Sequence, residues 1–256
     1  MRTLGAFLKK EWMEQIRNSR LLILALLFLL FGIMNPAVAK ITPWLMEMMA
    51  ESLEGSGLAV TEIKVDVLSS WTQFYKNIPM ALIAFVLLQS NIFTREYESG
   101  TLILALTKGL ERYKVVLAKF LVLIGTWTAG YWLCFGVTYA YNAYFWDNSI
   151  VSHLGVAAVY WWLLGIWTIL LMVLFSVLGS SNSMVLLGTG GVFFAVYLLS
   201  IIPKCKEYMP TKLMDGMSLL MNVAEAGDYR KALIVTGISM ALCFIVSIPL
   251  FNKRQL

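Results

Sequence analysis

Residues 94–119 read TREYESGTLILALTKGLERYKVVLAK, a charged segment between two long hydrophobic runs. One charged residue at the centre of a membrane helix costs about 2.5 to 3.5 kcal/mol on insertion scales, so this segment is expected in water. Residues 102–106, LILAL, are nevertheless five consecutive apolar residues. They are too few for the roughly 20 that a membrane span needs. We expect them to be covered, either by the ends of the chain's own helices or by a partner.

The composition is that of an integral membrane protein. Hydrophobic residues make up 59 % of the 256 residues and charged residues 14 %, against about 45 to 50 % and about 25 % in soluble domains. The net charge of +5 comes from basic residues at span ends and in loops, without the continuous stripe of a nucleic-acid-binding surface. We therefore expect membrane lipid around the chain and no nucleic acid among its partners.

Six hydrophobic runs are long enough to cross a bilayer as helices. They cover residues 21–39, 74–93, 115–139, 154–178, 184–202 and 232–251. Residues 1–19 place apolar side chains at helical spacing with charged side chains elsewhere on the wheel, which is typical of an amphipathic helix in the membrane interface. The predicted fold is an all-α integral membrane protein, one domain over 1–256, with an N-terminal interfacial helix and six transmembrane helices.

The basic residues predict the orientation in the membrane. With both termini in the cytoplasm, twelve of the 20 basic residues lie on the inner side, as the positive-inside rule favours. Residues 94–114 are then cytoplasmic, and 41–73 and 203–231 are extracytoplasmic loops. The first run also resembles a cleavable signal peptide, whose apolar region has about 7 to 15 residues. Because the run at 21–39 is longer, we favour an uncleaved span.

The sequence lacks the motifs of an enzyme. It contains no Gly-Lys dipeptide, so the phosphate loop G-x-x-x-x-G-K-[ST] is absent. One histidine, His153, and three cysteines without C-x-x-C spacing offer no catalytic or metal-ligand set. The middle of each predicted span carries no Asp, Glu, Lys or Arg, whereas transporters driven by protons or ions generally place ionisable groups there. If the chain transports, its energy is expected from outside the membrane.

Polar residues end the second predicted span. Gln89, Ser90 and Asn91 lack partners in lipid, so they should face other helices or a water-filled cavity. They are candidates for lining a transport pathway. Hydrogen bonding between helices explains them equally well.

The order of motifs in the charged segment resembles a known family. Arg95-Glu96, Glu98 and Gly100-Thr101-Leu102 precede the apolar run, and TKGLER follows at 107–112. This order is similar to the loop between the second and third spans of type-2 ABC exporter permeases, the transmembrane subunits of ABC-2 type transporters. The six-span layout extends the resemblance over nearly the whole chain. Gly109 stands where the family often has a proline.

The resemblance implies that 94–114 is a cytoplasmic coupling segment. Its coupling helix, residues 96–106, would dock in a groove of a separate ATP-hydrolysing subunit, and residues 1–19 would be the family's elbow helix. The apolar run would be buried against the ATPase, with the charged residues before it at the rim. The residues assigned to docking are Arg95, Glu96, Glu98, Gly100, Thr101, Leu102, Leu104 and Leu106.

The resemblance also implies a function. The chain would be the permease subunit of an ATP-driven exporter in the plasma membrane, paired with two copies of an ABC ATPase that bind ATP and Mg. The chain itself would bind no cofactor or metal and would not be an enzyme. It would form a homodimer, or a heterodimer with a related permease. Uncharged spans rich in Trp, Phe and Met suit an amphiphilic or hydrophobic cargo such as a peptide, lipid or drug. A non-transporting membrane scaffold or immunity protein is the alternative.

Overall fold

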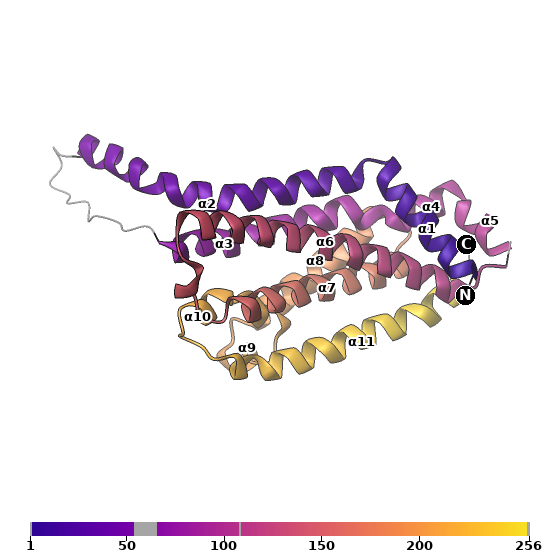
Figure 1. Cartoon of the computed structure of the whole chain (residues 1–256). Helices are drawn as coiled ribbons and strands as arrows, with labels where there is room; N and C mark the ends of the chain where they lie inside the picture. The colour runs from indigo at the N-terminus through magenta and orange to yellow at the C-terminus, as the bar shows by residue number, and fades with distance from the viewer. Residues whose placement is uncertain (1, 54–65, 108, 255–256) are drawn as a thin grey trace.

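The computed structural model describes residues 2–53, 66–107 and 109–254. Within these ranges all regular structure is helical, which confirms the predicted fold class. Six helices are long and apolar enough to cross a membrane, and they lie lengthwise in one bundle (Figure 1). They are α2 (Arg20–Leu53), α3 (Val67–Gln89), α6 (Arg112–Phe145), α7 (Leu154–Leu178), α8 (Asn182–Leu199) and α11 (Arg230–Lys253).

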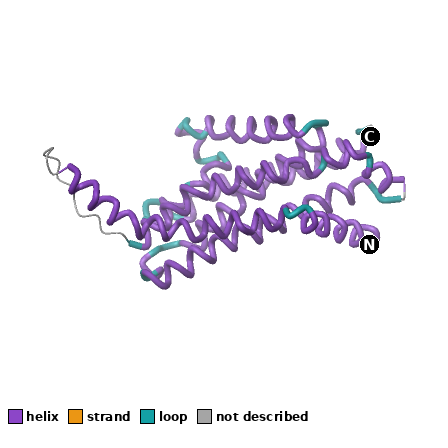
Figure 2. The backbone as a smooth tube through the Cα atoms, turned by 90° about the horizontal axis from the view of Figure 1, so that it is seen from above, coloured by secondary structure: helices purple, strands orange, loops and turns teal. Residues whose placement is uncertain are grey.

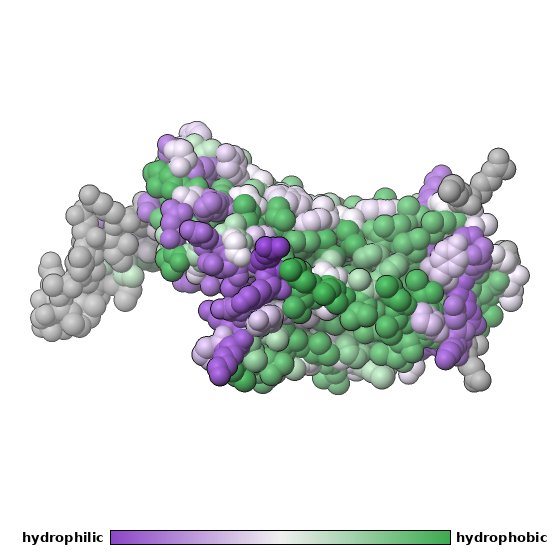
Figure 3. Space-filling model, turned by 90° about the horizontal axis from the view of Figure 1, so that it is seen from below, coloured by the Kyte–Doolittle hydropathy of each residue, from purple (hydrophilic) through white to green (hydrophobic). Residues whose placement is uncertain are grey.

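Short helices lie at the two ends of the bundle. One end carries both chain termini with α1 (Arg2–Arg17), α4 (Thr94–Ser99) and α5 (Thr101–Thr107), and we call it the termini end (Figures 1 and 2). The far end carries α9 (Pro203–Lys206) and α10 (Gly216–Leu220). The described residues also form four 3-10 helices: η1 (Ser90–Ile92), η2 (Asn148–Ile150), η3 (Pro210–Met214) and η4 (Ala226–Tyr229). Seen from below, hydrophobic surface fills the middle and hydrophilic surface gathers at both ends (Figure 3). This belt is what a membrane-spanning bundle requires.

The first span is longer than its uncharged run. Ser19, with a φ of 55°, turns the chain between α1 and α2. Helix α2 then continues through Pro36 and Pro43 to Leu53, so residues 41–53, which we expected in a loop, extend the helix. Residues 54–65 of that expected loop lie outside the described residues. Thus α2 projects from the far end of the bundle (Figure 1).

The core of the bundle is built on α7 and α6. Of the six spanning helices, α7 has the largest share of buried residues and α8 and α11 have the smallest. The indole of Trp127 on α6 is fully buried and lies over Gly165 of α7, where a Cβ atom would overlap the ring. Phe28 and Phe85 meet the same ring edge-on, at 5.8 and 5.5 Å between centroids. Such edge-to-face pairs are a favourable aromatic arrangement. They join α2, α3, α6 and α7 in mid-bundle.

The connection 203–231 folds back over the far end instead of extending away from it. The indole of Trp161 on α7 donates to the carbonyl of Met214 at 2.9 Å. The hydroxyl of Tyr229 donates to the carbonyl of Asp215 at 2.7 Å, and Gly216 packs on the ring of Tyr75 from α3. These contacts hold the connection against the spans.

Candidate functional site

The segment predicted to couple the chain to an ATPase lies at the termini end and is divided into two helices. Gly100 has a φ of 66°, a left-handed conformation that glycine adopts at little cost. It ends α4, and α5 begins at the next residue. The single helix expected over 96–106 is therefore interrupted at Gly100. After α5, Gly109, with a φ of 84°, turns the chain towards α6.

Helix α5 presents different residues to the bundle and to the outside. Leu102 is 1 % exposed and belongs to the core, and Leu106 packs against that core. Ile103 is 44 % exposed and Leu104 is 62 % exposed, while Thr101 is also exposed. The chain's own helices therefore cover only part of the described apolar run. The chain itself covers Leu102, and it leaves Ile103 and Leu104 uncovered.

The charged residues of α4 also divide into two groups. Arg95 and Glu98 are exposed, as residues at the rim of an interface would be. Glu96 is 4 % exposed. Its carboxylate lies 2.8 Å from the ammonium of Lys119 on α6 and pairs with Lys10 on α1. In this structure Glu96 is therefore held inside the chain.

Lys119 is the centre of an ion-pair cluster formed by Lys10, Glu11, Glu96 and Lys119, which we call the Lys119 cluster. The Lys119 side chain is 1 % exposed and its Nζ lies 3.1 Å from Oε2 of Glu11. The same ammonium donates to the carbonyl of Ile92 at 2.9 Å. Lys119 thus donates hydrogen bonds to Glu11 of α1 and to the chain just before α4, and it holds Glu96 of α4 as an ion pair. Buried charges are tolerated when opposite charges lie this close to them.

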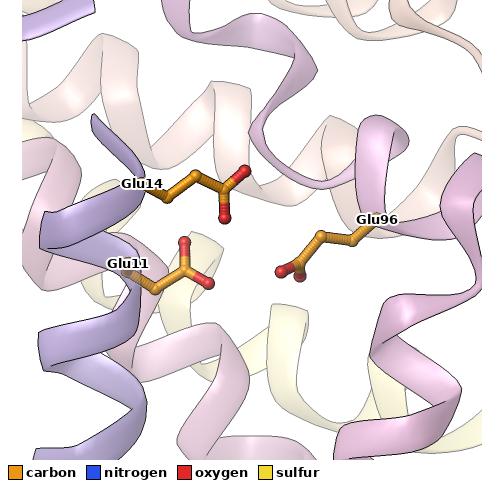
Figure 4. Close-up of side chains that lie close together, drawn as sticks. All are labelled: Glu11, Glu14 and Glu96. Carbon is orange, nitrogen blue, oxygen red and sulfur yellow. The ribbon is translucent and has the colours of Figure 1, made fainter. Parts of the chain in front are cut away.

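A third carboxylate, that of Glu14, lies beside the cluster. Glu11 and Glu14 of α1 point towards Glu96 of α4 (Figure 4), and oxygens of the three lie within 4.8 Å of one another. The lysines already neutralise them, since Nζ of Lys10 is 3.1 Å from Glu14. Burial lowers the pKa of Lys10, but attraction to Glu11 and a hydrogen bond with Glu96 outweigh it and raise the pKa above its ordinary value. We assign no metal to these carboxylates.

The predicted pathway residues lie next to this cluster. Gln89 is fully buried, and its amide exchanges two hydrogen bonds with Gln15 of α1, at 2.9 and 3.1 Å. Ser90 is buried and donates to the carbonyl of Leu87 at 3.1 Å. Asn91 is half-buried, and its Oδ1 accepts no hydrogen bond from the described residues. In this structure Gln89 makes the helix-to-helix bond that was the alternative explanation, and a lining role stays a prediction.

A second feature lies within the spans. An apolar groove with a cavity volume of about 370 Å³ opens between α3 and α8, with α7 and η3 behind it. Pro79, Leu87, Trp161 and Phe193 are among its lining residues, and Thr189 is a polar one. Its size is in the range of pockets that hold small apolar ligands. No sequence motif marks this groove.

The Lys119 cluster could have been found from the sequence. Lys119 lies four residues inside the predicted span 115–139, and an ionisable residue within a span usually has a named partner. Glu11, in the amphipathic N-terminal helix, is a candidate for such a partner. The expectation that residues 94–119 lie in water does not hold for Lys119, whose side chain is 1 % exposed.

The comparisons with known proteins agree with the layout. A family model described as ABC-2 family transporter protein matches residues 6–255. The match runs from α1 to the end of α11 and includes α4 and α5. A comparison with curated proteins found no match.

Proposed function

The chain belongs to the ABC-2 transporter family, and from this premise we propose that it is the permease subunit of an ATP-driven exporter whose ATPase docks on α5. The observation that carries the docking site is the exposure of Ile103 and Leu104 on a helix whose other face is held in the core. An uncovered apolar pair outside the spans is costly in water and suits the buried centre of an interface. Arg95 and Glu98 would lie at its rim.

The proposal assigns the sides of the membrane. The termini end, with α1, α4 and α5, would be cytoplasmic because the ATPase works where ATP is present, and twelve of the 20 basic residues would lie on that side. The membrane would be the plasma membrane. The connection 203–231, at the far end of the bundle, would face the outside of the cell. ATP and Mg would belong to the partner, with two ATPase copies in the complex.

Two features of the spans bear on the cargo and on a second permease subunit. We propose an amphiphilic or hydrophobic cargo, because the groove between α3 and α8 is lined almost wholly by apolar residues. Helix α8 has few buried residues, so a second permease, identical or related, would cover it. The groove would then lie near the contact of the two subunits.

The docking site is tested by placing one charge on each face of α5. Leu104→Glu should leave membrane yield normal and remove the ATPase from the purified complex, because an unpaired charge would be buried in the interface. Leu102→Glu should lower membrane yield, because the same charge would enter the chain's own core. The measurements are yield in the membrane fraction, co-purification of the ATPase and ATP hydrolysis.

The matched control is Thr107→Glu, which adds the same charge at an exposed position of the same helix. It should leave all three measurements unchanged. Normal co-purification in Leu104→Glu would refute docking at that residue. A wild-type chain that brings down no ATPase would instead favour the non-transporting scaffold.

A further inference from the structure

Arg254 lies directly after α11 and reaches the end of a different helix. Its guanidinium donates to the carbonyls of Ser176 and Val177, in the last turn of α7. Carbonyls in a final helical turn have no partner within the helix, and a cation there is also favoured by the helix dipole. Arg254 therefore caps α7 from outside.

Tyr97 of α4 contacts both Arg254 and the last turn of α7. The guanidinium carbon of Arg254 lies 4.0 Å from the centre of the Tyr97 ring, within the range of a cation–π interaction. The hydroxyl of Tyr97 donates to the carbonyl of Ser176 at 3.3 Å. Three elements, α4, α7 and the residue after α11, thus share one contact.

The backbone of Arg254 is itself held in place. Arg112, the first residue of α6, donates to the carbonyls of Phe251 and Arg254, at 2.9 and 2.6 Å. The ring of Phe251 meets the ring of Phe93, just before α4, at 6.2 Å between centroids. Arg254 is therefore held at its backbone carbonyl by Arg112 and at its guanidinium by the end of α7.

Two neighbouring residues of α4 make side-chain contacts with different helices. Glu96 connects α4 to α1 and α6 through the Lys119 cluster. Tyr97 connects it to α7 and to the end of α11. Successive residues of a helix point about 100° apart, which allows one short helix to hold both sides of the bundle.

We propose that Arg254 is a positioning residue that ties α4 to the α7 side of the bundle, so that a displacement of α5 by the ATPase moves α7 together with α6. This rests on the proposed function. Without Arg254, α4 would keep the hydrogen bond from Tyr97 to Ser176 of α7 but would lose its contact with the end of α11. The ATPase would still dock, since Ile103 and Leu104 are on α5. During ATP hydrolysis, however, the displacement of α5 would move α6 without moving α7 to the same extent.

The first test needs only the permease. In lipid nanodiscs, Arg254→Gln should raise amide hydrogen exchange in α4 about tenfold, which corresponds to losing contacts of ordinary strength. Tyr97→Leu should also raise exchange in α4, and the double variant should fall short of the sum of the two effects, because both changes remove the cation–π contact that the two side chains share. Arg254→Lys should be intermediate, because lysine keeps the charge but not the planar fork.

The second test uses the complex with the co-purified ATPase. Arg254→Gln should keep the wild-type subunit ratio and the KM for ATP, while kcat falls about tenfold. Lys253→Gln removes the neighbouring exposed charge and should match wild type in both tests. If Arg254→Gln accumulates poorly, Arg254→Lys replaces it, since it keeps the charge but loses the planar fork, and should raise exchange in α4 about threefold.

Three outcomes would overturn the proposal. Exchange in α4 could be the same in Arg254→Gln, or in Arg254→Lys where that variant replaces it, as in Lys253→Gln. The effects of Arg254→Gln and Tyr97→Leu could add fully. The ATPase could be lost from Arg254→Gln without a change in exchange, which would make Arg254 a direct docking contact. Failure of docking on α5 would show separately, as normal ATPase co-purification in Leu104→Glu.

Discussion

The hydroxyl of Thr138 on α6 donates a 3.0 Å hydrogen bond to the carbonyl of Gly32 on α2. The usual donor to that carbonyl would be the amide of residue 36, and Pro36 has no N–H. Gly32 makes the approach possible, because a Cβ there would lie 3.0 Å from the carbonyl of Cys134. One helix thus supplies the hydrogen bond that the neighbouring helix lacks. This is how a proline is tolerated inside a membrane span.

Removing that donor should destabilise the chain in a way that depends on Pro36. We expect Thr138→Val to lower the free energy of unfolding by about 1 kcal/mol, measured by thermal unfolding in detergent, and Thr138→Ser to do little. In a Pro36→Ala background, where the amide is restored, the loss should be smaller. It should not vanish, because Asn35 also donates to Thr138. Equal losses in the two backgrounds would contradict this explanation.

Lys119→Met should be strongly destabilising. It removes the buried cation between Glu11 and Glu96 and leaves the partly exposed Lys10 beside these two buried carboxylates, and breaking a buried pair in this way costs about 3 to 5 kcal/mol. We expect a large fall in membrane yield and in the unfolding temperature. Lys114→Met is the matched control on α6, because its partner Glu111 is exposed and leaving an exposed carboxylate unpaired costs little. Similar behaviour of the two variants would show that the Lys119 cluster is not a stabilising element.

The glycines of the spans should separate into two classes. Gly130 lies against the ring of Phe28, which a Cβ would overlap, whereas a Cβ at Gly190 meets nothing within 4 Å. Gly130→Ala should therefore cost about 1 to 3 kcal/mol of stability by overpacking. Gly190→Ile should preserve yield but lower the dimer fraction measured by crosslinking, if a second permease covers α8. A full dimer fraction in Gly190→Ile would place the subunit contact elsewhere.

The orientation can be tested with a native thiol. Cys205 lies in α9 at the far end and is partly exposed, whereas Cys134 is buried. A membrane-impermeant maleimide should label wild-type chain in intact cells and should not label Cys205→Ser. Labelling that appears only after permeabilisation would reverse the proposed topology.

The spans were predictable because their signal is local. A hydrophobic run of about 20 residues has few other stable environments, and each predicted run has its helix in the structure. The continuity of α2 through Pro36 and Pro43 was not predictable from propensity, because a proline inside a helix usually kinks or ends it. The packing of the connection 203–231 on the far end was not predictable either, because it depends on contacts with Trp161 and Tyr75, which are distant in sequence.

In the segment predicted for coupling, residues 94–114, the sequence did not indicate which side chains the chain itself buries. In the sequence Leu102 and Leu104 are equivalent members of one apolar run, but only Leu102 is buried by the chain. The difference follows from the rotation of α5 after Gly100, which the composition of the run does not specify. Glu96 was assigned to a rim on the same local evidence, and its partners Lys10 and Lys119 are 86 and 23 positions away.

The left-handed residue at Gly100 also separates two kinds of evolutionary constraint. At Glu96 and Tyr97 of α4, selection acts through contacts with the chain's own helices. If an ATPase docks on α5 as proposed, selection at Ile103 and Leu104 would act through the partner, because both side chains are exposed in the chain itself. The choice of partner could then change, or be re-engineered, at residues 103 and 104 without redesign of the membrane-spanning bundle.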